Sequence, residues 1–308
     1  MPASISFADR LADAVRQKKA AVMVGLDPRY ESLPKSLRER RNADDWTARA
    51  EAYKEFCRGL IDVVAPLVPA VKPQAAFFEE LGPAGAMVLA DVISYARGRD
   101  LLVVLDAKRG DIGTSAEAYA RGYLSANGPW AADALTVNPY LGDDSLQPFV
   151  DIARANQAGV FVLVKTSNPG GAQFQDLFAA HKPIYRHVAL HVQTLAAVDI
   201  SQSGFGATGA VVGATYPDQL AELRELMDRS WLLIPGYGSQ GGTARDVAAG
   251  FRQDGLGAIV NNSRGIIFAH ARPEYRDRFG EHRWQEAVEA ATRDMIDELR
   301  AETAAGGL

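Results

Sequence analysis

The sequence contains a single cysteine, Cys57, among its 308 residues, so it cannot form an intrachain disulfide. The cysteine lies beside apolar residues with helical spacing, which predicts a packing role. No uninterrupted apolar stretch is long enough to cross a bilayer. The first residues also lack the apolar core of a signal peptide. We therefore expect a soluble protein with no membrane partner, located in the cytoplasm.

The sequence also lacks an excess of positive charge. Its net charge is −5 and its pI is about 5.6, which excludes a general binder of nucleic acids or membrane surfaces. A local basic site for an anionic small molecule remains compatible with this charge. No composition break, low-complexity linker or internal repeat divides the chain, so we expect one domain spanning residues 1–308.

Short runs rich in β-branched residues alternate with longer amphipathic stretches. The eight expected strands are 21–26, 70–72, 101–106, 134–138, 160–165, 210–213, 231–235 and 258–261. The expected helices are 46–64, 83–97, 115–126, 144–156, 217–228, 243–249 and 284–301. Strands that alternate with helices predict a parallel sheet. Eight such units favour a closed (β/α)8 (TIM) barrel in the α/β class over an open doubly wound sheet.

Four further segments complete the expected fold. An amphipathic helix at 4–18 is expected to cap the bottom of the barrel. The charged segments 31–45 and 272–283 are expected to be irregular loops beside the barrel mouth. Residues 301–308 are expected to fray, as chain ends often do.

Charged residues directly follow three of the expected strands. Asp27 follows the first strand, Lys72 ends the second, and the third supplies Asp106, Lys108 and Asp111. Side chains two residues apart on a strand share a face, and the strand ends of such a barrel form one mouth. A lysine flanked by carboxylates stays protonated, which suits a proton donor and fixed cation rather than a Schiff-base nucleophile. The alternative is an ion-pair network that only stabilises the barrel.

A glycine-rich loop follows the seventh expected strand. The run 235–243 reads Pro-Gly-Tyr-Gly-Ser-Gln-Gly-Gly-Thr and opens a helix, where free amides favour an anion. A dinucleotide site would need an acid at the end of the next strand, but Arg264 follows that strand and suits phosphate. The sequence thus favours a phosphate monoester over a plain capping turn.

His187 and His191 have the spacing of a metal pair without a surrounding zinc motif, so we favour a solvated helix face and expect no metal site.

The run 106–113, Asp-Ala-Lys-Arg-Gly-Asp-Ile-Gly, resembles the signature of the orotidine 5′-phosphate decarboxylases. The loops Val-Lys-Thr-Ser-Asn-Pro at 164–169 and Pro-Gly-Tyr-Gly-Ser-Gln-Gly-Gly at 235–242 are similar to the longer bacterial subfamily (type 2). This resemblance implies a carboxy-lyase that converts orotidine 5′-phosphate to uridine 5′-phosphate, the last step of de novo pyrimidine synthesis. It also implies a homodimer with shared active sites and no cofactor.

The resemblance implies roles for individual residues. Lys108 would protonate the pyrimidine carbon after carbon dioxide leaves, Asp106 would lie against the substrate carboxylate, and Asp111 would enter the partner's site. Asp27 and Lys72 would contact the ribose. The remaining substrate contacts would come from Ser167, with or without Thr166, from Thr114 or Ser115, and, at the phosphate, from Gln240, Gly241, Gly242 and Arg264.

Three alternatives remain open. A metal-dependent sugar-phosphate decarboxylase or hexulose-phosphate synthase on the same scaffold would need acidic ligands at the strand ends, where Lys72 would repel a metal. A Schiff-base aldolase would use Lys165, at the end of the fifth strand. A non-catalytic nucleotide-binding protein would have no need of the full set of acids and lysines.

Overall fold

The computed structural model describes residues 5–238 and 241–308. Eight parallel strands close into a barrel with the order β1-β10-β9-β8-β5-β4-β3-β2. These strands are β1 (Val22–Leu26), β2 (Ala70–Pro73), β3 (Leu102–Arg109), β4 (Ala134–Val137), β5 (Gly159–Lys165), β8 (Thr208–Val212), β9 (Leu232–Ile234) and β10 (Ala258–Asn262). The expected α/β barrel and its strands are confirmed. An additional hairpin of β6 (Phe178–Ala179) and β7 (Lys182–Pro183) lies outside the barrel and was not expected.

The barrel strands are buried on both faces, as parallel strands covered by helices are. Every residue of β1, β8 and β10 is buried. Close packing inside the barrel depends on Gly209 of β8, where a Cβ would lie 2.6 Å from the carbonyl oxygen of Trp231 and 2.7 Å from the ring of Phe161. The interior therefore holds a packed core beneath the mouth.

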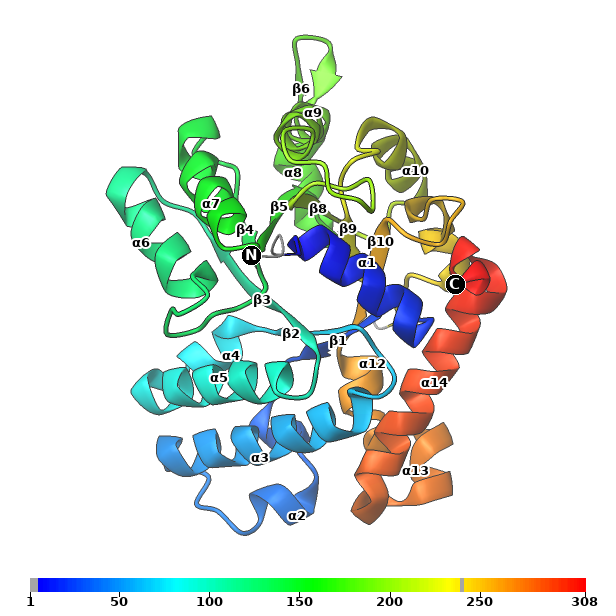
Figure 1. Ribbon diagram of the computed structural model, residues 1–308. Coiled ribbons are helices and arrows are strands. Elements are labelled where there is room, and N and C mark those ends of the chain that lie inside the picture. Colours follow the sequence, from blue (N-terminus) through cyan, green and yellow to red (C-terminus); the bar gives the residue numbers. More distant parts are fainter. Residues whose placement is uncertain (1–4, 239–240) are drawn as a thin grey trace.

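Helices surround the barrel (Figure 1). The longer ones are α3 (Trp46–Val64), α5 (Gly82–Arg97), α6 (Gly113–Leu124), α7 (Asp143–Ala155), α9 (Ile184–Ala196), α10 (Pro217–Leu226) and α14 (Trp284–Glu302). The shorter ones are α2 (Lys35–Arg38), α4 (Ala75–Glu79), α8 (Ala172–Gln175), α11 (Ala244–Val247), α12 (Arg264–Ile267) and α13 (Pro273–Phe279). All expected helices are present, although 243–249 becomes the four-residue α11 followed by a 3-10 turn. No helix in the described ranges is long and apolar enough to span a membrane.

Helix α1 (Phe7–Lys18) crosses the amino end of the barrel, as Figure 1 shows, and confirms the expected capping helix. The Phe7 ring packs edge-to-face on Phe161 of β5, with ring centroids 6.0 Å apart. Arg10 forms an ion pair with Asp133, which directly precedes β4, at 2.5 Å. An apolar contact and an ion pair thus hold α1 against the bottom of the barrel.

Three segments differ from the expected irregular or frayed structure. Segment 31–45 contains α2, and segment 272–283 contains α13, whose Tyr275 and Phe279 are buried against α14. The end of the chain forms a 3-10 turn, Ala304–Gly307, instead of fraying. Ala305 is buried there, and its amide donates to the Thr303 hydroxyl at 3.1 Å. These segments are ordered because they bury apolar side chains, which the charged composition of the first two obscures.

Cys57 is completely buried in α3, which confirms its predicted packing role. Burial and the nearby Asp27 carboxylate raise the pKa of its thiol. The thiol therefore stays protonated at neutral pH.

Candidate active site

A cavity of about 1030 Å³ opens at the carboxyl ends of the barrel strands, opposite α1. Each strand, or the residue that follows it, contributes to its lining. Leu163 of β5, Val211 of β8 and Leu233 of β9 supply apolar surface. Polar and charged side chains come from β2, β3, β4 and β10 and from Asp27, which follows β1. The barrel thereby brings residues far apart in sequence to one mouth, as the sequence predicted.

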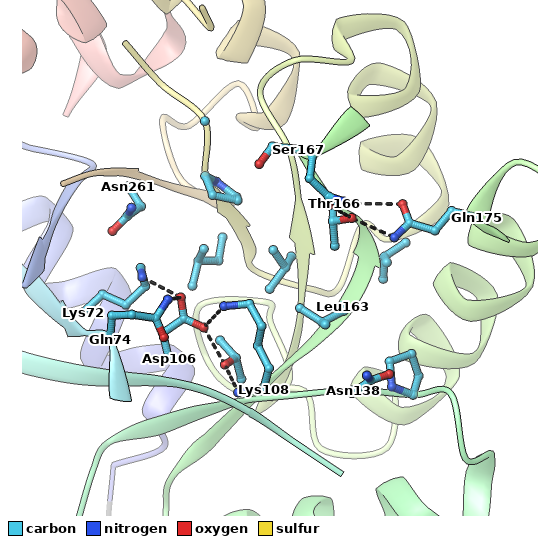
Figure 2. A pocket seen from close by; sticks show the side chains of 18 of the residues that line it. Lys72, Gln74, Asp106, Lys108, Asn138, Leu163, Thr166, Ser167, Gln175 and Asn261 are labelled. Atoms are coloured by element: carbon cyan, nitrogen blue, oxygen red, sulfur yellow. Dashed lines mark hydrogen bonds and ion pairs between the residues drawn. The ribbon is translucent and has the colours of Figure 1, made fainter. Parts of the chain in front are cut away.

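Asp106 is the centre of an ion-pair network in this cavity (Figure 2). The residue is only 7% exposed. One oxygen, Oδ2, accepts from Lys72 Nζ at 2.6 Å and from Gln74 Nε2 at 3.2 Å. The other, Oδ1, accepts from Lys108 Nζ at 2.6 Å and from Thr136 Oγ1 at 2.9 Å. One buried carboxylate therefore has four donors, two of which are ammonium groups.

The network fixes the charges of its buried members. Burial opposes ionisation of Asp106, but the Lys72 and Lys108 ammonium groups outweigh it and hold the carboxyl pKa well below its usual range. Burial likewise opposes the charge of Lys72, and attraction to Asp106 and Asp27 outweighs it, so the pKa of Lys72 is raised. Asp106 is thus an anion and Lys72 a cation at neutral pH. The Lys108 side chain is 44% exposed, so it is the member open to the cavity.

A bulge in β3 directs Lys108 toward Asp106. The backbone φ of Lys108 is 48°, in the left-handed region, and the pairing of β3 with β4 shifts register between Leu105 and Arg109. Thr136 of β4 supports the bulge, because its hydroxyl accepts from the Lys108 amide at 2.9 Å while it donates to Asp106. The expected meeting of Asp106 and Lys108 is found, although simple strand alternation does not produce it.

Asp111 does not join this network within its own chain. The chain turns away from the mouth after β3 to begin α6, and Asp111 Oδ1 accepts from the Ile112 amide at 2.8 Å. Asp111 lines a separate surface hollow with Ser115 and Tyr119. The expectation that all five ionisable groups point to one mouth is therefore wrong for Asp111. Thr114 and Ser115 are both exposed in the first turn of α6, and of the two only Ser115 lines this hollow.

Two buried oxygen atoms beside the cavity have no hydrogen-bond partner among the described residues, Asp27 Oδ1 and Asn261 Oδ1. Both residues line the cavity. Figure 2 places Asn261 on the same side as Lys72. Buried polar atoms normally have partners, so these oxygens favour a ligand that brings hydrogen-bond donors to this side.

Thr166 and Ser167 lie on the opposite wall of the cavity (Figure 2). The Thr166 amide donates to Gln175 Oε1 at 3.0 Å, and Gln175 Nε2 donates back to the Thr166 hydroxyl at 2.8 Å. That hydroxyl also donates to Asn168 Oδ1 at 2.7 Å. The Thr166 side chain thus holds its own loop together, and Ser167 follows it at the edge of the cavity.

The glycine loop lies beside the same mouth, although Gln240 falls outside the described residues. The Gly241 amide donates to the Gly238 carbonyl at 2.9 Å, and the Gly242 amide donates to the Gly236 carbonyl at 3.2 Å. The expected helix after this loop is only the four-residue α11, which begins with a capping box of its own residues. Arg264 lines both the main cavity and the hollow behind the loop. Arg264 is therefore the cation that the structure brings to the expected phosphate position.

The two histidines have separate partners. His187 Nε2 lies 2.8 Å from the Ala179 carbonyl oxygen, and His191 Nε2 lies 2.8 Å from the Asp143 carboxylate. Within the described part of the chain, no group of three or more His, Cys, Asp or Glu side chains is placed to hold a metal ion. The geometry therefore gives no support to a histidine metal pair.

A model of the orotidine 5′-phosphate decarboxylase / HUMPS family matches residues 21–276. The chain belongs to this family. An orotidine 5′-phosphate decarboxylase of Rhodopirellula baltica is 51% identical over 300 residues, covering 96% of this chain and 99% of the relative. One of Haloarcula marismortui is 45% identical over 264 residues, covering 85% and 87%. The solved structure of Leishmania donovani OMP decarboxylase has a TM-score of 0.73 and 33% identity, covering 97% and 98% of the two chains.

Three polar residues that line the cavity were not predicted from the sequence. They are Gln74, Thr136 and Asn261. Gln74 lies two residues after Lys72, so strand spacing alone places it on the same face. Thr136 is a polar residue inside the otherwise apolar strand β4, and such a residue calls for a partner. Both signals were present in the sequence. The signal for Asn261 was weaker, because Asn262 follows it and the sequence does not show which of the two faces the cavity.

Proposed function

We propose that this chain decarboxylates orotidine 5′-phosphate to uridine 5′-phosphate without a cofactor. The observation that carries the proposal is the Lys108 ammonium, held 2.6 Å from a buried, ionised Asp106 and half-open to a cavity that can hold a nucleotide. The decarboxylase names of the two relatives described above support the same reaction.

Lys108 performs two tasks in this reaction. When the bond to the carboxylate breaks, carbon dioxide leaves and its bonding electrons remain on the pyrimidine carbon. The ring cannot delocalise this in-plane pair well, so a fixed cation beside it supplies the stabilisation. The ammonium of Lys108 then transfers a proton to that carbon, forming the C–H bond of the product. The resulting neutral amine regains its proton from water.

Asp106 and Lys72 keep that ammonium in place. The depressed pKa of Asp106 keeps its carboxylate charged, and the two lysines bond to different oxygens of it. Asp106 also lies where the substrate carboxylate would enter, which adds repulsion in the ground state. We give more weight to the stabilisation by Lys108, because it acts on charge that develops during the reaction.

The remaining contacts follow the polar groups around the cavity. We assign the unsatisfied Asp27 oxygen to a ribose hydroxyl and Lys72 to the ribose. Ser167 is assigned to the pyrimidine edge, because the Thr166 hydroxyl already has two partners. Arg264 is assigned to the phosphate. The remaining phosphate contacts are assigned to Gln240, Gly241 and Gly242. The backbone amides of the two glycines would then donate to phosphate oxygens instead of to the carbonyls of Gly238 and Gly236.

A homodimer would give Asp111 a place in the reaction. Asp111 and Ser115 line a hollow on the outer surface, away from their own cavity. The neighbouring Ile112 is 58% exposed and Tyr119 is 40% exposed, and exposed apolar side chains of this kind favour a protein interface. We therefore assign Asp111 to the active site of a partner subunit, with Ser115 favoured over Thr114 as the accompanying hydroxyl.

The alternatives fit the site less well. Lys72 and Lys108 both contact Asp106, so the central carboxylate is already neutralised and a divalent metal would meet two ammonium groups. A Schiff-base lysine needs apolar surroundings or a neighbouring cation, whereas Lys165 pairs with Asp176. If a metal-dependent reaction were correct, a chelator would abolish turnover; we expect turnover of orotidine 5′-phosphate to be unchanged in excess EDTA.

The decisive experiment compares the wild type with Lys108→Ala by following the loss of orotidine 5′-phosphate absorbance. We expect the wild type to turn over without added metal and the variant to lose about 10⁴-fold or more in kcat. Lys182→Ala, an exposed change on the β6–β7 hairpin, is the matched control and should stay within about twofold. Circular dichroism checks that both variants fold. A folded Lys108→Ala enzyme with wild-type turnover would refute the proposal.

A further inference from the structure

Lys165, at the carboxyl end of β5, has a completely buried side chain. Its ammonium bonds to Asp176, just after α8 on the segment between β5 and α9. We propose that this ion pair is a positioning device that holds residues 166–176 against the end of β5, so that the wall carrying Thr166 and Ser167 keeps its shape. The inference rests on the proposed function, because that function assigns the wall to the pyrimidine.

The surroundings of the Lys165 ammonium make Asp176 its charge partner. The nitrogen lies 4.4 Å from the ring centroid of Tyr216 and 5.5 Å from that of Tyr185, so aromatic faces enclose it. The Tyr185 hydroxyl turns to Glu222, to which it donates at 3.0 Å. A buried ammonium is costly without a counter-charge. If the segment moved away, it would take Asp176 with it and leave the Lys165 ammonium unpaired.

A second pair lies next to the first and extends the attachment into the cavity. Thr166 and Gln175, the direct neighbours of Lys165 and Asp176, exchange two hydrogen bonds at 3.0 and 2.8 Å. Figure 2 shows this second pair at the wall opposite Lys72 and Asp106. A Cβ at Gly171 would lie 2.8 Å from the Thr166 hydroxyl, so the intervening turn closes tightly over this contact. Two successive residues of the strand end are therefore joined to two successive residues of the segment.

The attached segment forms a large part of the cavity wall. Asn168, Phe174 and Gln175 of the segment, and Leu177 directly after it, line the cavity together with Thr166 and Ser167. Phe174 is 60% exposed and Leu177 is 56% exposed, so apolar packing beneath these side chains contributes little to holding the segment. The buried ion pair therefore supplies the attachment to the end of β5 that apolar packing does not. Lys165 is thus a positioning residue, acting on substrate through Thr166 and Ser167.

The test uses Lys165→Met, which removes the buried charge, Asp176→Asn, and the double variant. Lys182→Met, an exposed lysine on the β6–β7 hairpin, is the control. Each protein is measured for amide hydrogen exchange across 166–176 without ligand, for binding of uridine 5′-phosphate, and for kcat and KM with orotidine 5′-phosphate. Asp176 is 42% exposed, so Lys165→Met leaves a carboxylate that water can reach. This variant is expected to fold even if Asp176→Asn, which leaves a buried ammonium unpaired, does not.

We expect faster exchange confined to the segment and a loss of about 10- to 100-fold in kcat/KM, carried mainly by KM, in both single variants. The double variant should be no worse than the poorer single one, because the two residues act as a unit. The inference would be overturned by folded variants whose amide hydrogen exchange across 166–176 and whose KM equal those of the wild type, even if their Tm were lower. The ion pair would then have a structural role only. If the wild type itself lacks turnover, the proposed function fails, whereas unchanged exchange in the segment would still overturn the positioning role separately.

Discussion

Two buried aspartates, Asp106 and Asp133, lie at opposite ends of the adjoining strands β3 and β4, and each has a cationic partner. Asp133 precedes β4 at the bottom of the barrel, where it accepts from Arg10 of α1 at 2.5 Å and from the Val103 amide at 2.9 Å. Asp106 faces the mouth, where it accepts from two lysines. Their exposures are similar, 5% and 7%, so burial does not distinguish a structural carboxylate from a functional one.

The two aspartates differ in the location of their hydrogen-bond donors. Both donors of Asp133 belong to parts of the fold that must meet, the capping helix and the start of strand β3. The second cation of Asp133, Arg97, lies 4.0 Å from it. The second cation of Asp106, Lys108, is hydrogen-bonded at 2.6 Å and reaches the cavity with 44% of its side chain exposed. A bonded ammonium that is directed at an open cavity is a group available to a ligand.

The sharpest test of this comparison is Asp106→Asn. The amide lacks the charge that holds two ammonium groups together, so Lys72 and Lys108 would repel each other and Lys108 would lose its position. We expect kcat/KM for orotidine 5′-phosphate to fall about 10³-fold or more. The measurement is the same absorbance assay, on protein whose folding is checked by circular dichroism. Activity within tenfold of wild type would show that Asp106 resembles Asp133 after all.

Asp133→Asn should have the opposite profile. It weakens the Arg10 ion pair and the contact between α1 and the barrel, so we expect the free energy of unfolding to fall by about 2–3 kcal/mol. Urea denaturation followed by circular dichroism measures this loss. Turnover per folded molecule should stay within about twofold of wild type, because the change lies at the opposite end from the cavity. A loss of activity comparable to that of Asp106→Asn would remove the distinction between the two ends.

Acid provides a third and smaller contrast. The pKa of Asp106 is lowered in the folded protein, so its contribution to stability is complete above the ordinary aspartate pKa of about 4. That contribution is lost as pH falls below this value toward the folded pKa, because the unfolded chain then binds a proton that the folded chain does not. Between pH 5 and pH 3, this one group should cost about 1 kcal/mol of stability.

Urea denaturation at the two pH values, in wild type and Asp106→Asn, measures that cost. The variant should lose less stability than wild type over the same interval. Equal losses in both proteins would mean that Asp106 does not titrate as the ion pairs require.

The site residues that sequence reasoning found are those whose positions follow from one strand at a time. Lys72, Asp106 and Lys108 stand at strand ends, and the barrel brings strand ends together. Strand spacing alone misplaced Asp111 in the mouth of its own barrel, because the bulge at Lys108 and the start of α6 turn the chain outward. Local pattern therefore predicts which strand end carries a charge, but not its direction after a break in the strand.

The contacts between distant segments were beyond prediction from the sequence. Arg10 and Asp133 are separated by 123 positions, and only the closed barrel brings them into contact. Lys165, at the end of the fifth expected strand, was the candidate nucleophile of the Schiff-base alternative, yet its ammonium bonds to Asp176. The ordered end of the chain likewise depends on apolar contacts of Ala305 and Leu308 with the core. In each case, the tertiary partner decides the role, and the residue type alone is ambiguous.

The smallest effect concerns two tyrosines that bond to carboxylates of the same helix, α14. Tyr237, which lines the cavity and begins the glycine loop, donates to Glu298, whereas Tyr275 of α13 donates to Asp294 at 2.7 Å. If α14 supports the loop through Glu298, Tyr237→Phe should weaken binding of uridine 5′-phosphate about threefold, in keeping with one hydrogen bond. Tyr275→Phe is the matched control, because it removes the same kind of bond to α14 from a residue that is not part of the loop. Isothermal titration should therefore show a weaker Kd only for Tyr237→Phe, and equal affinities in the two variants would mean that the helix stabilises the fold without shaping the site.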